Sequence, residues 1–420
     1  MGRRRAIDGV GVSAQGTAGS RAFAPLAHRD DLEKFRAEVR AWLEAVVPEG
    51  WFARSAGASD ADYLAFQRWW LSELQKVGFA TPHWPKDWGG EELSLRHQVI
   101  VSEEMVRANA PSPDLYVVSL YHLPATLFAH GSPAQRERYL KGVTERGEIW
   151  CQGFSEPNAG SDLASLRTRA EKRGGAYVVN GQKVWSSFAA NASYCLLLAR
   201  TDPNTPKKQA GISYFILDMK APGVTVRPIK QMTGQSEFCE IFLDNVEVPA
   251  ENLIGAENAG WMIAQSTLSA ERGLIIFDLA ERMHAAFERE IAAARVAKPR
   301  WWSDDALRRT FVQQFAELQS LRQLIRRMLE ELESNAEAGA SSLPPLIKIK
   351  WSELLRRHTE FWLAATGLET QKYAPPLTGG GHVTGNRMQD FMWSYSWTIA
   401  GGANEIIKTL IAERVLGLPR

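Results

Sequence analysis

The hydrophobic period changes twice along this chain of 420 residues. Apolar residues recur at helical spacing from about residue 30 to residue 146, alternate with polar residues between 150 and 249, and return to helical spacing from residue 259 onward. The outer patterns are typical of amphipathic helices and the middle one of half-buried strands. The sequence therefore predicts an α+β fold with an N-terminal helical domain, a middle β-barrel or sandwich domain and a C-terminal four-helix-bundle domain.

The same changes set the expected domain boundaries. We expect a tail over 1–28, the N-terminal helical domain over 29–150, the β-domain over 151–250 and the C-terminal helical bundle over 251–420. The tail carries four arginines among Gly, Ala and Ser residues, and it has no amphipathic apolar pattern. This composition predicts a disordered tail, with an organelle transit segment as the alternative.

Turn residues divide the middle segment into short strands. Asn180-Gly181 lies between two apolar runs and predicts a tight hairpin, because both residues tolerate a positive φ. Further strands are predicted over 194–199, 212–218, 224–229 and 240–248. In the C-terminal part, helices are predicted over 259–296, 304–335, 346–366 and 404–416. The Gly-rich segment 378–385 does not follow a strand, so we expect a mobile surface loop there rather than a phosphate-binding loop.

The composition excludes several classes of function. Lys and Arg total 49 and Asp and Glu total 48, so a net charge of +1 gives no electrostatic reason to expect nucleic acid or an anionic membrane as a partner. No apolar run approaches the ~18 residues of a membrane span. Cys151, Cys195 and Cys239 form no paired motif, which predicts a reducing compartment: the cytoplasm, or the mitochondrial matrix if the tail is a transit segment. The histidines are scattered, and no metal site is predicted.

Two segments of the middle domain have the residue types of a binding site. Residues 153–162 (Gly-Phe-Ser-Glu-Pro-Asn-Ala-Gly-Ser-Asp) present backbone N–H groups and hydroxyls that can bind a ring carbonyl or a phosphate. In residues 180–187, Trp185 stands beside Ser186 and Ser187, which suits a flat heteroaromatic cofactor. Taken singly, the first segment is equally compatible with an ordinary turn, and a strand tryptophan is more often part of a core.

These two segments, together with three others in order along the chain, resemble the acyl-CoA dehydrogenase family. The others are Trp-Pro-Lys-Asp-Trp-Gly-Gly at 84–90, Gly-Ser-Pro-Ala-Gln-Arg-Glu-Arg-Tyr-Leu at 131–140 with Gly147-Glu148, and the ending at 399–406 and 412–419. The resemblance covers nearly all of the chain after the tail. It implies an FAD-dependent oxidoreductase of lipid metabolism that removes a proton from Cα and a hydride from Cβ of an acyl-CoA thioester, leaving the trans-2-enoyl-CoA.

The resemblance also implies the site residues and the partners. The residues that match cofactor-binding positions are Gln152, Phe154, Ser155, Gly160, Ser161, Trp185, Ser186, Ser187, Ala403, Asn404 and Glu405. Those that match substrate positions are Ser161, Ser269, Arg272 and Gly402, and residues such as Tyr116, Tyr121, His122 and Leu123 would select the acyl group. An electron-transferring flavoprotein is the expected electron acceptor, with oxygen as the alternative. The expected assembly is a homo-oligomer, as a dimer or tetramer, or an α2β2 heterotetramer.

The catalytic base is assigned by a separate comparison with the family. Many members keep a Glu in the loop before the final helix, where this chain has Gly401, which can remove no proton. The branch with isovaleryl-CoA and long-chain dehydrogenases places its Glu directly before an Arg on the first long helix after the β-domain, and Glu271 matches that position. We therefore predict Glu271 as the base. The alternative is an exposed Glu271–Arg272 pair.

Two family segments are replaced in this chain. Residues 296–304 stand where many relatives have an Arg-x-x-Phe-Gly segment that holds a neighbouring subunit's FAD, and residues 366–373 stand where a Gly-Gly-x-Gly-aromatic turn is usual. These departures are compatible with a subunit of a mixed assembly. The alternative function is accordingly a non-catalytic or half-site partner subunit of an acyl-CoA dehydrogenase complex.

Overall fold

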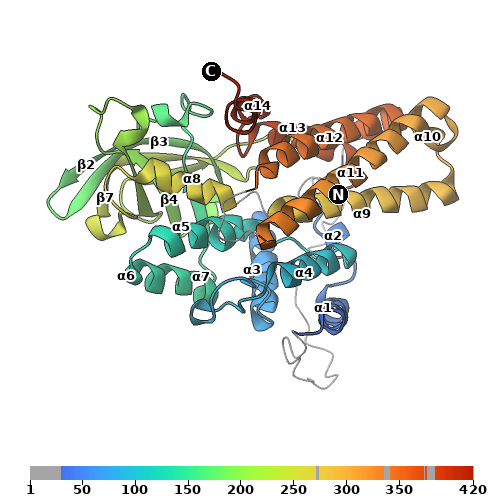
Figure 1. The fold of residues 1–420 in the computed structure, drawn as a ribbon, viewed down its shortest axis with the longest axis horizontal. Helices are drawn as coiled ribbons and strands as arrows, with labels where there is room; N and C mark the ends of the chain where they lie inside the picture. The colour runs from blue at the N-terminus through green and yellow to red at the C-terminus, as the bar shows by residue number, and fades with distance from the viewer. Residues whose placement is uncertain (1–29, 271–273, 335–340, 373, 376–383, 420) are drawn as a thin grey trace, which may run out of the picture.

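In the computed structural model, the strands occupy one end of the molecule and the long C-terminal helices the other, with the N-terminal helices alongside both (Figure 1). The structure describes residues 30–270, 274–334, 341–372, 374–375 and 384–419. The predicted tail and most of the Gly-rich segment 378–385 therefore lie outside the described residues. The predicted α+β architecture of helices, a β-sheet and a helical bundle is confirmed.

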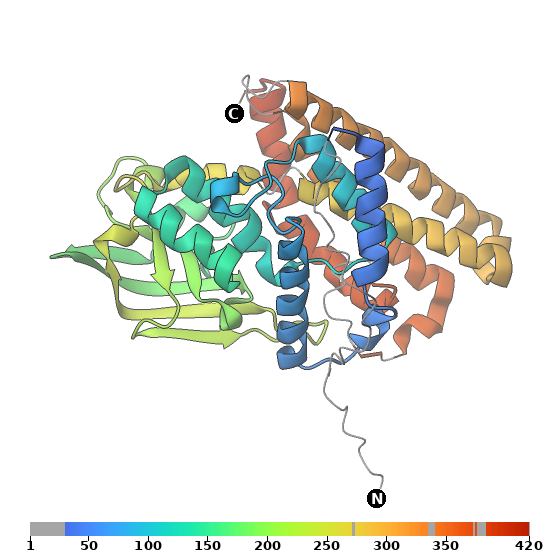
Figure 2. The ribbon, with the colours of Figure 1, turned by 90° about the horizontal axis from the view of Figure 1, so that it is seen from below.

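The N-terminal part is helical. Its helices are α1 (Leu32–Val46), α2 (Trp51–Arg54), α3 (Asp60–Lys76), α4 (Leu95–Arg107), α5 (Leu123–His130), α6 (Pro133–Gln135) and α7 (Lys141–Arg146). Two π-helical turns, Val118–His122 and Arg136–Leu140, run directly into α5 and α7. The helices share one core with strand residues such as Leu196, Leu198 and Tyr214. Figure 2 shows the teal helices α5 and α7 over the sheet, whereas the dark-blue α1 lies beside the C-terminal helices.

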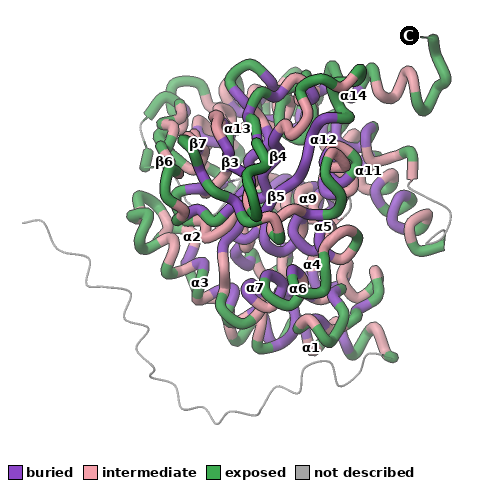
Figure 3. Tube along the Cα trace, turned by 90° about the vertical axis from the view of Figure 1, so that its left-hand side faces the viewer, coloured by how far each residue is buried: buried purple, intermediate pink, exposed green. Residues whose placement is uncertain are grey.

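The described part of the middle segment forms a seven-stranded sheet. Its strands are β1 (Trp150–Gly153), β2 (Arg169–Arg173), β3 (Ala176–Ser187), β4 (Tyr194–Arg200), β5 (Ile212–Asp218), β6 (Val224–Pro228) and β7 (Phe238–Pro249). They are ordered β1-β4-β2-β3-β7-β6, and β5 pairs with β4. One face of β4 and β5 packs on the N-terminal helices, and the other encloses a core of its own. Strands β4 and β5 are almost wholly buried, whereas β2 and β6 are largely exposed. Figure 3 shows the C-terminal end of the chain exposed as well.

The hairpin predicted at Asn180-Gly181 is wrong. Strand β3 continues through both residues, with a shift of its register against β7 between Val179 and Gly181, and the chain turns before it, at Gly174-Gly175. Asn180 instead accepts a hydrogen bond from the backbone N–H of Asn245 on β7, at 2.9 Å. Glycine is required at 181 because a Cβ there would lie 2.4 Å from Oγ1 of Thr168. Pairing of β3 with β7 therefore outweighs the turn preference of the dipeptide.

The C-terminal part contains the bundle and one helix that packs elsewhere. Its helices are α8 (Gly260–Ala270), α9 (Leu274–Ala297), α10 (Arg300–Ser303), α11 (Asp305–Ser334), α12 (Leu343–Thr366), α13 (Arg387–Ile399) and α14 (Asn404–Leu410), the last extended by a π-helical turn, Ile411–Val415. Helix α13 was not predicted. Helices α9, α11 and α12 share one core, on which Trp397 of α13 also packs. Ile263 and Ala264 of α8 lie in the core of the N-terminal helices instead.

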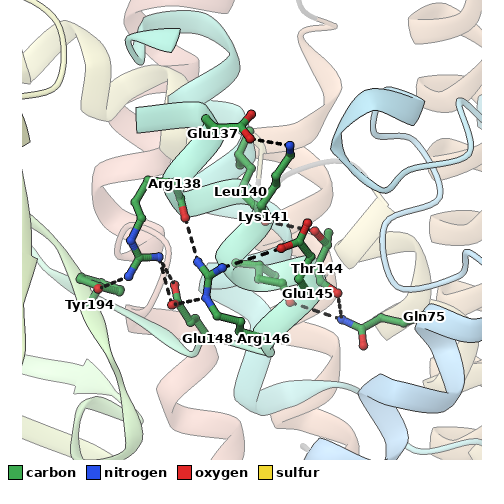
Figure 4. Close-up of polar contacts among 11 residues, drawn as sticks. Gln75, Glu137, Arg138, Leu140, Lys141, Thr144, Glu145, Arg146, Glu148 and Tyr194 are labelled. Carbon is green, nitrogen blue, oxygen red and sulfur yellow. Dashed lines mark hydrogen bonds and ion pairs between the residues drawn. The ribbon is translucent and has the colours of Figure 1, made fainter. Parts of the chain in front are cut away.

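A network of charged side chains joins the N-terminal helices to the sheet (Figure 4). Arg138 donates to the Glu148 carboxylate at 3.1 Å and to the Tyr194 hydroxyl on β4 at 2.6 Å. Arg146 of α7 donates to the same carboxylate at 3.0 Å and to the carbonyl oxygen of Arg138 at 3.0 Å. Glu148 stands two residues before β1, so this network fixes the start of the strand that leads into residues 153–162.

Candidate active site

A buried ion pair holds the segment 153–162 in place. The Lys183 ammonium on β3 donates to the Glu156 carboxylate at 2.8 Å and to the carbonyl oxygen of Phe154 at 3.1 Å, and both charged side chains are buried. Glu156 also accepts from the backbone N–H groups of Arg167 at 2.6 Å and Thr168 at 2.8 Å. Burial opposes the charge of Glu156, but attraction to Lys183 and these hydrogen bonds outweigh it and lower its pKa. The segment is therefore a fixed turn with an ionised carboxylate beneath it.

The predicted binding residues of this segment lie on its accessible side, with one exception. Gly160 and Ser161 are exposed, and Gln152 and Ser155 are half-buried. Phe154 is buried edge-to-face against Tyr214, so it packs beneath the turn. The Nε2 of Gln152 is enclosed and has no hydrogen-bond partner among the described residues. An enclosed donor without a partner is costly, and a bound acceptor would satisfy it.

The second segment meets the first through the backbone. The N–H of Val184 donates to the carbonyl oxygen of Ser155 at 2.9 Å, which places Trp185 beside the turn. The β3–β7 register shifts between Lys183 and Ser186, and Trp185 sits at this bulge with a φ of 62°. A left-handed conformation costs a non-glycine residue ~1–3 kcal/mol and is concentrated at functional sites.

The bulge directs the three predicted side chains of this segment differently. Trp185 is 59% exposed, so it is not a core residue, and its ring packs edge-to-face on Phe238 at 6.1 Å between centroids. Ser186 is buried, and its Oγ has no hydrogen-bond partner among the described residues. Ser187 is half-buried. The two joined segments thus carry an accessible indole ring and enclosed polar atoms of Gln152 and Ser186 without partners, the kinds of group that suit a flat ring with hydrogen-bonding groups.

The loop before α14 presents its predicted residues in two directions. Gly401 and Gly402 are exposed and left-handed, with φ of 65° and 94°, and Glu405 is exposed. Ala403 is half-buried. Asn404, in contrast, is 3% exposed and is hydrogen-bonded to Lys348 and Ser352 of α12. The side chain of Asn404 thus points into the bundle, and a contact with a cofactor would have to use its backbone.

The predicted catalytic base lies outside the described residues, as does Arg272. Helix α8 ends at Ala270 and α9 begins at Leu274, on either side of residues 271–273. Ser269 belongs to the last turn of α8, where the structure describes the backbone alone. The roles of Glu271, Arg272 and Ser269 therefore stay predictions.

A group of carboxyl side chains between the three parts of the chain was missed by the sequence analysis. Burial, reinforced by mutual repulsion, raises the pKa of Glu237 next to β7 to about 8. Burial also raises the pKa of Asp114, which precedes α5, to about 6. Asp278 of α9 accepts from Arg282 at 2.7 Å. No local sequence pattern predicts these perturbed carboxyl groups, because the residues that bury each of them come from other parts of the chain.

Tyr121 alone among the four residues predicted to select the acyl group faces this carboxyl group. Burial raises its pKa to about 12, and it lies within electrostatic reach of Asp278, Arg282 and Asp114. Tyr116, His122 and Leu123 are buried in the N-terminal part.

Comparison with known proteins matches each part of the chain to one family. The N-terminal domain model of acyl-CoA dehydrogenases covers residues 29–147, the middle domain model 151–246 and the C-terminal domain model 258–416. The chain belongs to the acyl-CoA dehydrogenase family. This acyl-CoA dehydrogenase family member is accordingly an FAD-dependent oxidoreductase, and its Gln152, Trp185 and Ser186 fit a flavin ring in the way described above.

Relatives align along almost the whole chain. The acyl-CoA dehydrogenase IpdE1 of Mycolicibacterium smegmatis is 36% identical over 405 residues, which cover 93% of this chain and 98% of that relative. The acyl-CoA dehydrogenase FadE34 of Mycobacterium tuberculosis is 39% identical over 83% of this chain and 46% of its own length. Among solved structures, the Tcur3481-Tcur3483 steroid ACAD superimposes with a TM-score of 0.79 at 28% identity, covering 93% of this chain and 98% of that one.

A second solved structure is an assembly of two proteins. The ChsE4-ChsE5 complex from Mycobacterium tuberculosis has a TM-score of 0.73 at 27% identity, and the match covers 93% of this chain and 98% of that one. Within the described residues of the present chain, no helix is long and apolar enough to cross a membrane. Nor do His, Cys, Asp and Glu residues gather there in a group of three or more that could hold a metal ion.

Proposed function

We propose that the protein oxidises an acyl-CoA thioester to the trans-2-enoyl-CoA. The Cα proton leaves to a protein base, and the Cβ hydrogen leaves as a hydride with its electron pair, so that a C=C bond forms. FAD supplies the hydride acceptor when bound. The observation that supports the proposal is the junction of the two site segments. There the Val184–Ser155 hydrogen bond joins the strand that bears the accessible Trp185 ring and the unsatisfied Ser186 hydroxyl to the segment that begins next to the unsatisfied Gln152 amide.

The proposed cofactor site has two halves. Gln152, Ser155, Gly160, Ser161, Trp185, Ser186 and Ser187 form the β-domain half, with Phe154 packed beneath them. Ala403, Glu405 and the backbone of Asn404 form the half next to α14. Gly402 and Ser161 would contact the substrate, together with Ser269 and Arg272. Because the β-domain half offers both an aromatic surface and enclosed donors, it would bind and orient the ring and exclude water from it.

Glu271 is the proposed base. Gly401, at the other position that the family uses for a Glu, has no side chain and stands in an exposed loop. By its motif, the carboxylate of Glu271 is then the group of this chain that would remove the Cα proton. General base catalysis of this kind contributes typically ~10²–10⁴ in rate.

The names of the similar structures support two finer assignments. One is called a steroid ACAD and another a complex of two proteins, so we propose a bulky polycyclic acyl-CoA as the first substrate to try and an α2β2 assembly as the first to look for, with a homo-oligomer as the alternative. An electron-transferring flavoprotein is the proposed acceptor. The second candidate function, a partner subunit without catalysis, is favoured by Gly401 and by the replacement of two family segments, 296–304 and 366–373.

Anaerobic mixing of the FAD-loaded protein with a panel of acyl-CoA esters tests the proposal. We expect loss of flavin absorbance with at least one ester. The Glu271→Gln variant should keep the flavin and fail to bleach, whereas Glu288→Gln, an exposed carboxyl on α9, should bleach like the unaltered protein. Full bleaching of Glu271→Gln would show that another group is the base. Failure of the chain to hold FAD except with a paralogous subunit would favour the partner function.

A further inference from the structure

The loop before α14 is tied to the inside of the bundle by a buried lysine. Lys348 of α12 is 7% exposed, and its ammonium donates to the carbonyl oxygen of Gly402 at 2.7 Å and to Oδ1 of Asn404 at 2.9 Å. Ser352, one turn further along α12, donates to the same Oδ1 at 3.3 Å. The loop is therefore held through one backbone carbonyl and one side chain, from residues more than fifty positions earlier.

Burying a lysine at this place is costly, and the bundle does not need it for packing. An ammonium taken out of water loses several kcal/mol of hydration, and hydrogen bonds to a charged donor return ~1.5–3 kcal/mol each. A leucine or methionine facing the same core would bury its side chain without that cost. Unlike an apolar residue, Lys348 can hold Gly402 and Asn404 in fixed positions through hydrogen bonds.

The loop has little else to fix it. Gly401 and Gly402 both stand in the left-handed region, and glycine loses more conformational freedom on ordering than any other residue. Ala403, the residue directly before α14, provides no side-chain cap for the helix. Without the lysine, the glycine pair could rotate, and the positions of Gly402, Ala403 and Glu405 would become variable.

We infer that Lys348 is a positioning residue, which holds the loop 401–405 in the conformation that meets the cofactor and the substrate. The inference rests on the proposed function of that loop, because it concerns how the loop is held rather than which groups it touches. Lys348 itself acts through Gly402 and Asn404 and need not touch either ligand. Its substitution should therefore impair binding and turnover together, since a displaced loop weakens both.

The test compares three variants of the FAD-loaded enzyme. Lys348→Met removes both hydrogen bonds at similar volume, Lys348→Arg keeps a charged donor, and Lys350→Met is the matched control, because Lys350 lies two residues on in α12, is 53% exposed and faces Glu317 at 3.7 Å. We expect Lys348→Met to raise KM for acyl-CoA and to lower kcat, with kcat/KM reduced about 10–100-fold, and to change the visible flavin spectrum. Lys348→Arg should recover part of each effect, and Lys350→Met should match the unaltered enzyme.

Hydrogen exchange of the amides of 402–406 gives a readout that does not depend on turnover. In Lys348→Met we expect these amides to exchange about tenfold faster, while those of β3 stay unchanged. If Lys348→Met does not fold, Lys348→Gln, which keeps an N–H donor, takes its place in both measurements. Unaltered KM, kcat and exchange in the variant would overturn the positioning role. An unaltered enzyme that no acyl-CoA reduces would instead refute the proposed function, with the exchange result still standing.

Discussion

The two halves of the proposed cofactor site are held by different physical means. In the β-domain half, strand pairing fixes the backbone around Trp185, and the Glu156–Lys183 ion pair stabilises the adjoining turn. In the half next to α14, the glycine-containing loop takes part in no strand pairing among the described residues, and side chains of α12, Lys348 and Ser352, hold it. One half thus depends on long-range pairing of many backbone groups and the other on a few side-chain hydrogen bonds from α12.

This difference predicts which substitutions should destabilise each half. Many backbone hydrogen bonds stabilise the sheet, so loss of any one contact lowers its stability little. A substitution that leaves a buried charge without its partner should lower the stability of the β-domain half much more. The bundle contains a buried ion pair of its own, Glu281–Arg322. Next to the loop, however, its buried Lys348 bonds to neutral oxygen atoms, and its buried His358 bonds to neutral side chains. The two halves should therefore respond in opposite ways to pH and differently to single substitutions.

The largest expected effect is loss of the buried ion pair of the β-domain half. Lys183→Met leaves the Glu156 carboxylate buried without its cation, which should lower the free energy of unfolding by about 3–5 kcal/mol. Denaturant unfolding monitored by fluorescence measures this loss. Lys172→Met is the control: Lys172 is exposed and 3.6 Å from Glu257, so its change should stay within about 1 kcal/mol.

A double variant sharpens the same prediction. Lys183→Met combined with Glu156→Gln removes both charges, so it should lose less stability than Lys183→Met alone. Equal loss in the single and double variants would contradict the assignment of the cost to an unpaired carboxylate.

The next effect concerns the bundle in acid. Burial, with repulsion by Arg387, lowers the pKa of His358 to about 3; the ring bonds to Gln314 at 3.0 Å and accepts from Nε1 of Trp362 at 3.0 Å. Below a pH of about 6.5 the unfolded chain binds a proton that the folded chain excludes, so stability should fall as pH falls, by about 2 kcal/mol between pH 6.5 and 5.

Denaturant unfolding over this pH range isolates the contribution of His358. His358→Phe keeps an aromatic ring against Phe287 and should lose that part of the acid slope, although its stability is lower throughout. His130→Gln, outside the bundle, should keep the slope. An unchanged slope in His358→Phe would place the acid sensitivity elsewhere.

Hydrophobic periodicity and turn residues predicted the elements whose conformation depends mainly on neighbouring residues in the sequence. Strand β5 has the predicted bounds, 212–218, because a short apolar run between turn residues favours a buried strand over other conformations. The two binding segments also carry recognisable residues, and the structure joins them through Val184 and Ser155. Trp185 was assigned to the cofactor site by the resemblance to the family, since its residue type alone favours a core position. Its exposure and its strained bulge depend on the pairing with β7 and could not be predicted from the local sequence.

The rest depends on contacts between residues far apart. Asn180-Gly181 has the composition of a hairpin turn, and only the pairing with β7 decides that it lies within a continuous, bulged strand. Likewise, the sequence alone gives Lys348 the pattern of an ordinary polar residue on an amphipathic helix. Its role could not be predicted, because its partners Gly402 and Asn404 lie 54 and 56 residues further along the chain. The carboxyl pair of Asp114 and Glu237 acquires its environment only when the parts of the chain meet.

A smaller effect is expected in the β-domain half as the pH rises towards 8. Burial raises the pKa of Glu237 to about 8, so between about pH 4.5 and 8 the folded chain holds a proton that the unfolded chain releases. Stability should therefore fall as pH rises through this range and level off above it. Because the side chain keeps some accessible surface, we expect about 1 kcal/mol between pH 6 and 8. Glu237→Gln should remove this slope, and the exposed Glu247→Gln should retain it; a slope that survives in Glu237→Gln would contradict the assignment.

The smallest change in stability, and the sharpest test of the cofactor site, is expected at Ser186. Its enclosed Oγ has no partner among the described residues, so Ser186→Ala should leave the stability of the FAD-free protein within about 0.5 kcal/mol or raise it slightly. If that hydroxyl bonds to FAD, the same variant should hold the cofactor up to about tenfold more weakly, because a net hydrogen bond contributes ~0.5–1.5 kcal/mol. Titration of the FAD-free protein with FAD measures this, with Ser320→Ala, an exposed hydroxyl on α11, as the control. A Ser186→Ala variant that is destabilised without FAD yet binds it normally would show that Ser186 serves the fold and that the β-domain half holds the ring by other groups.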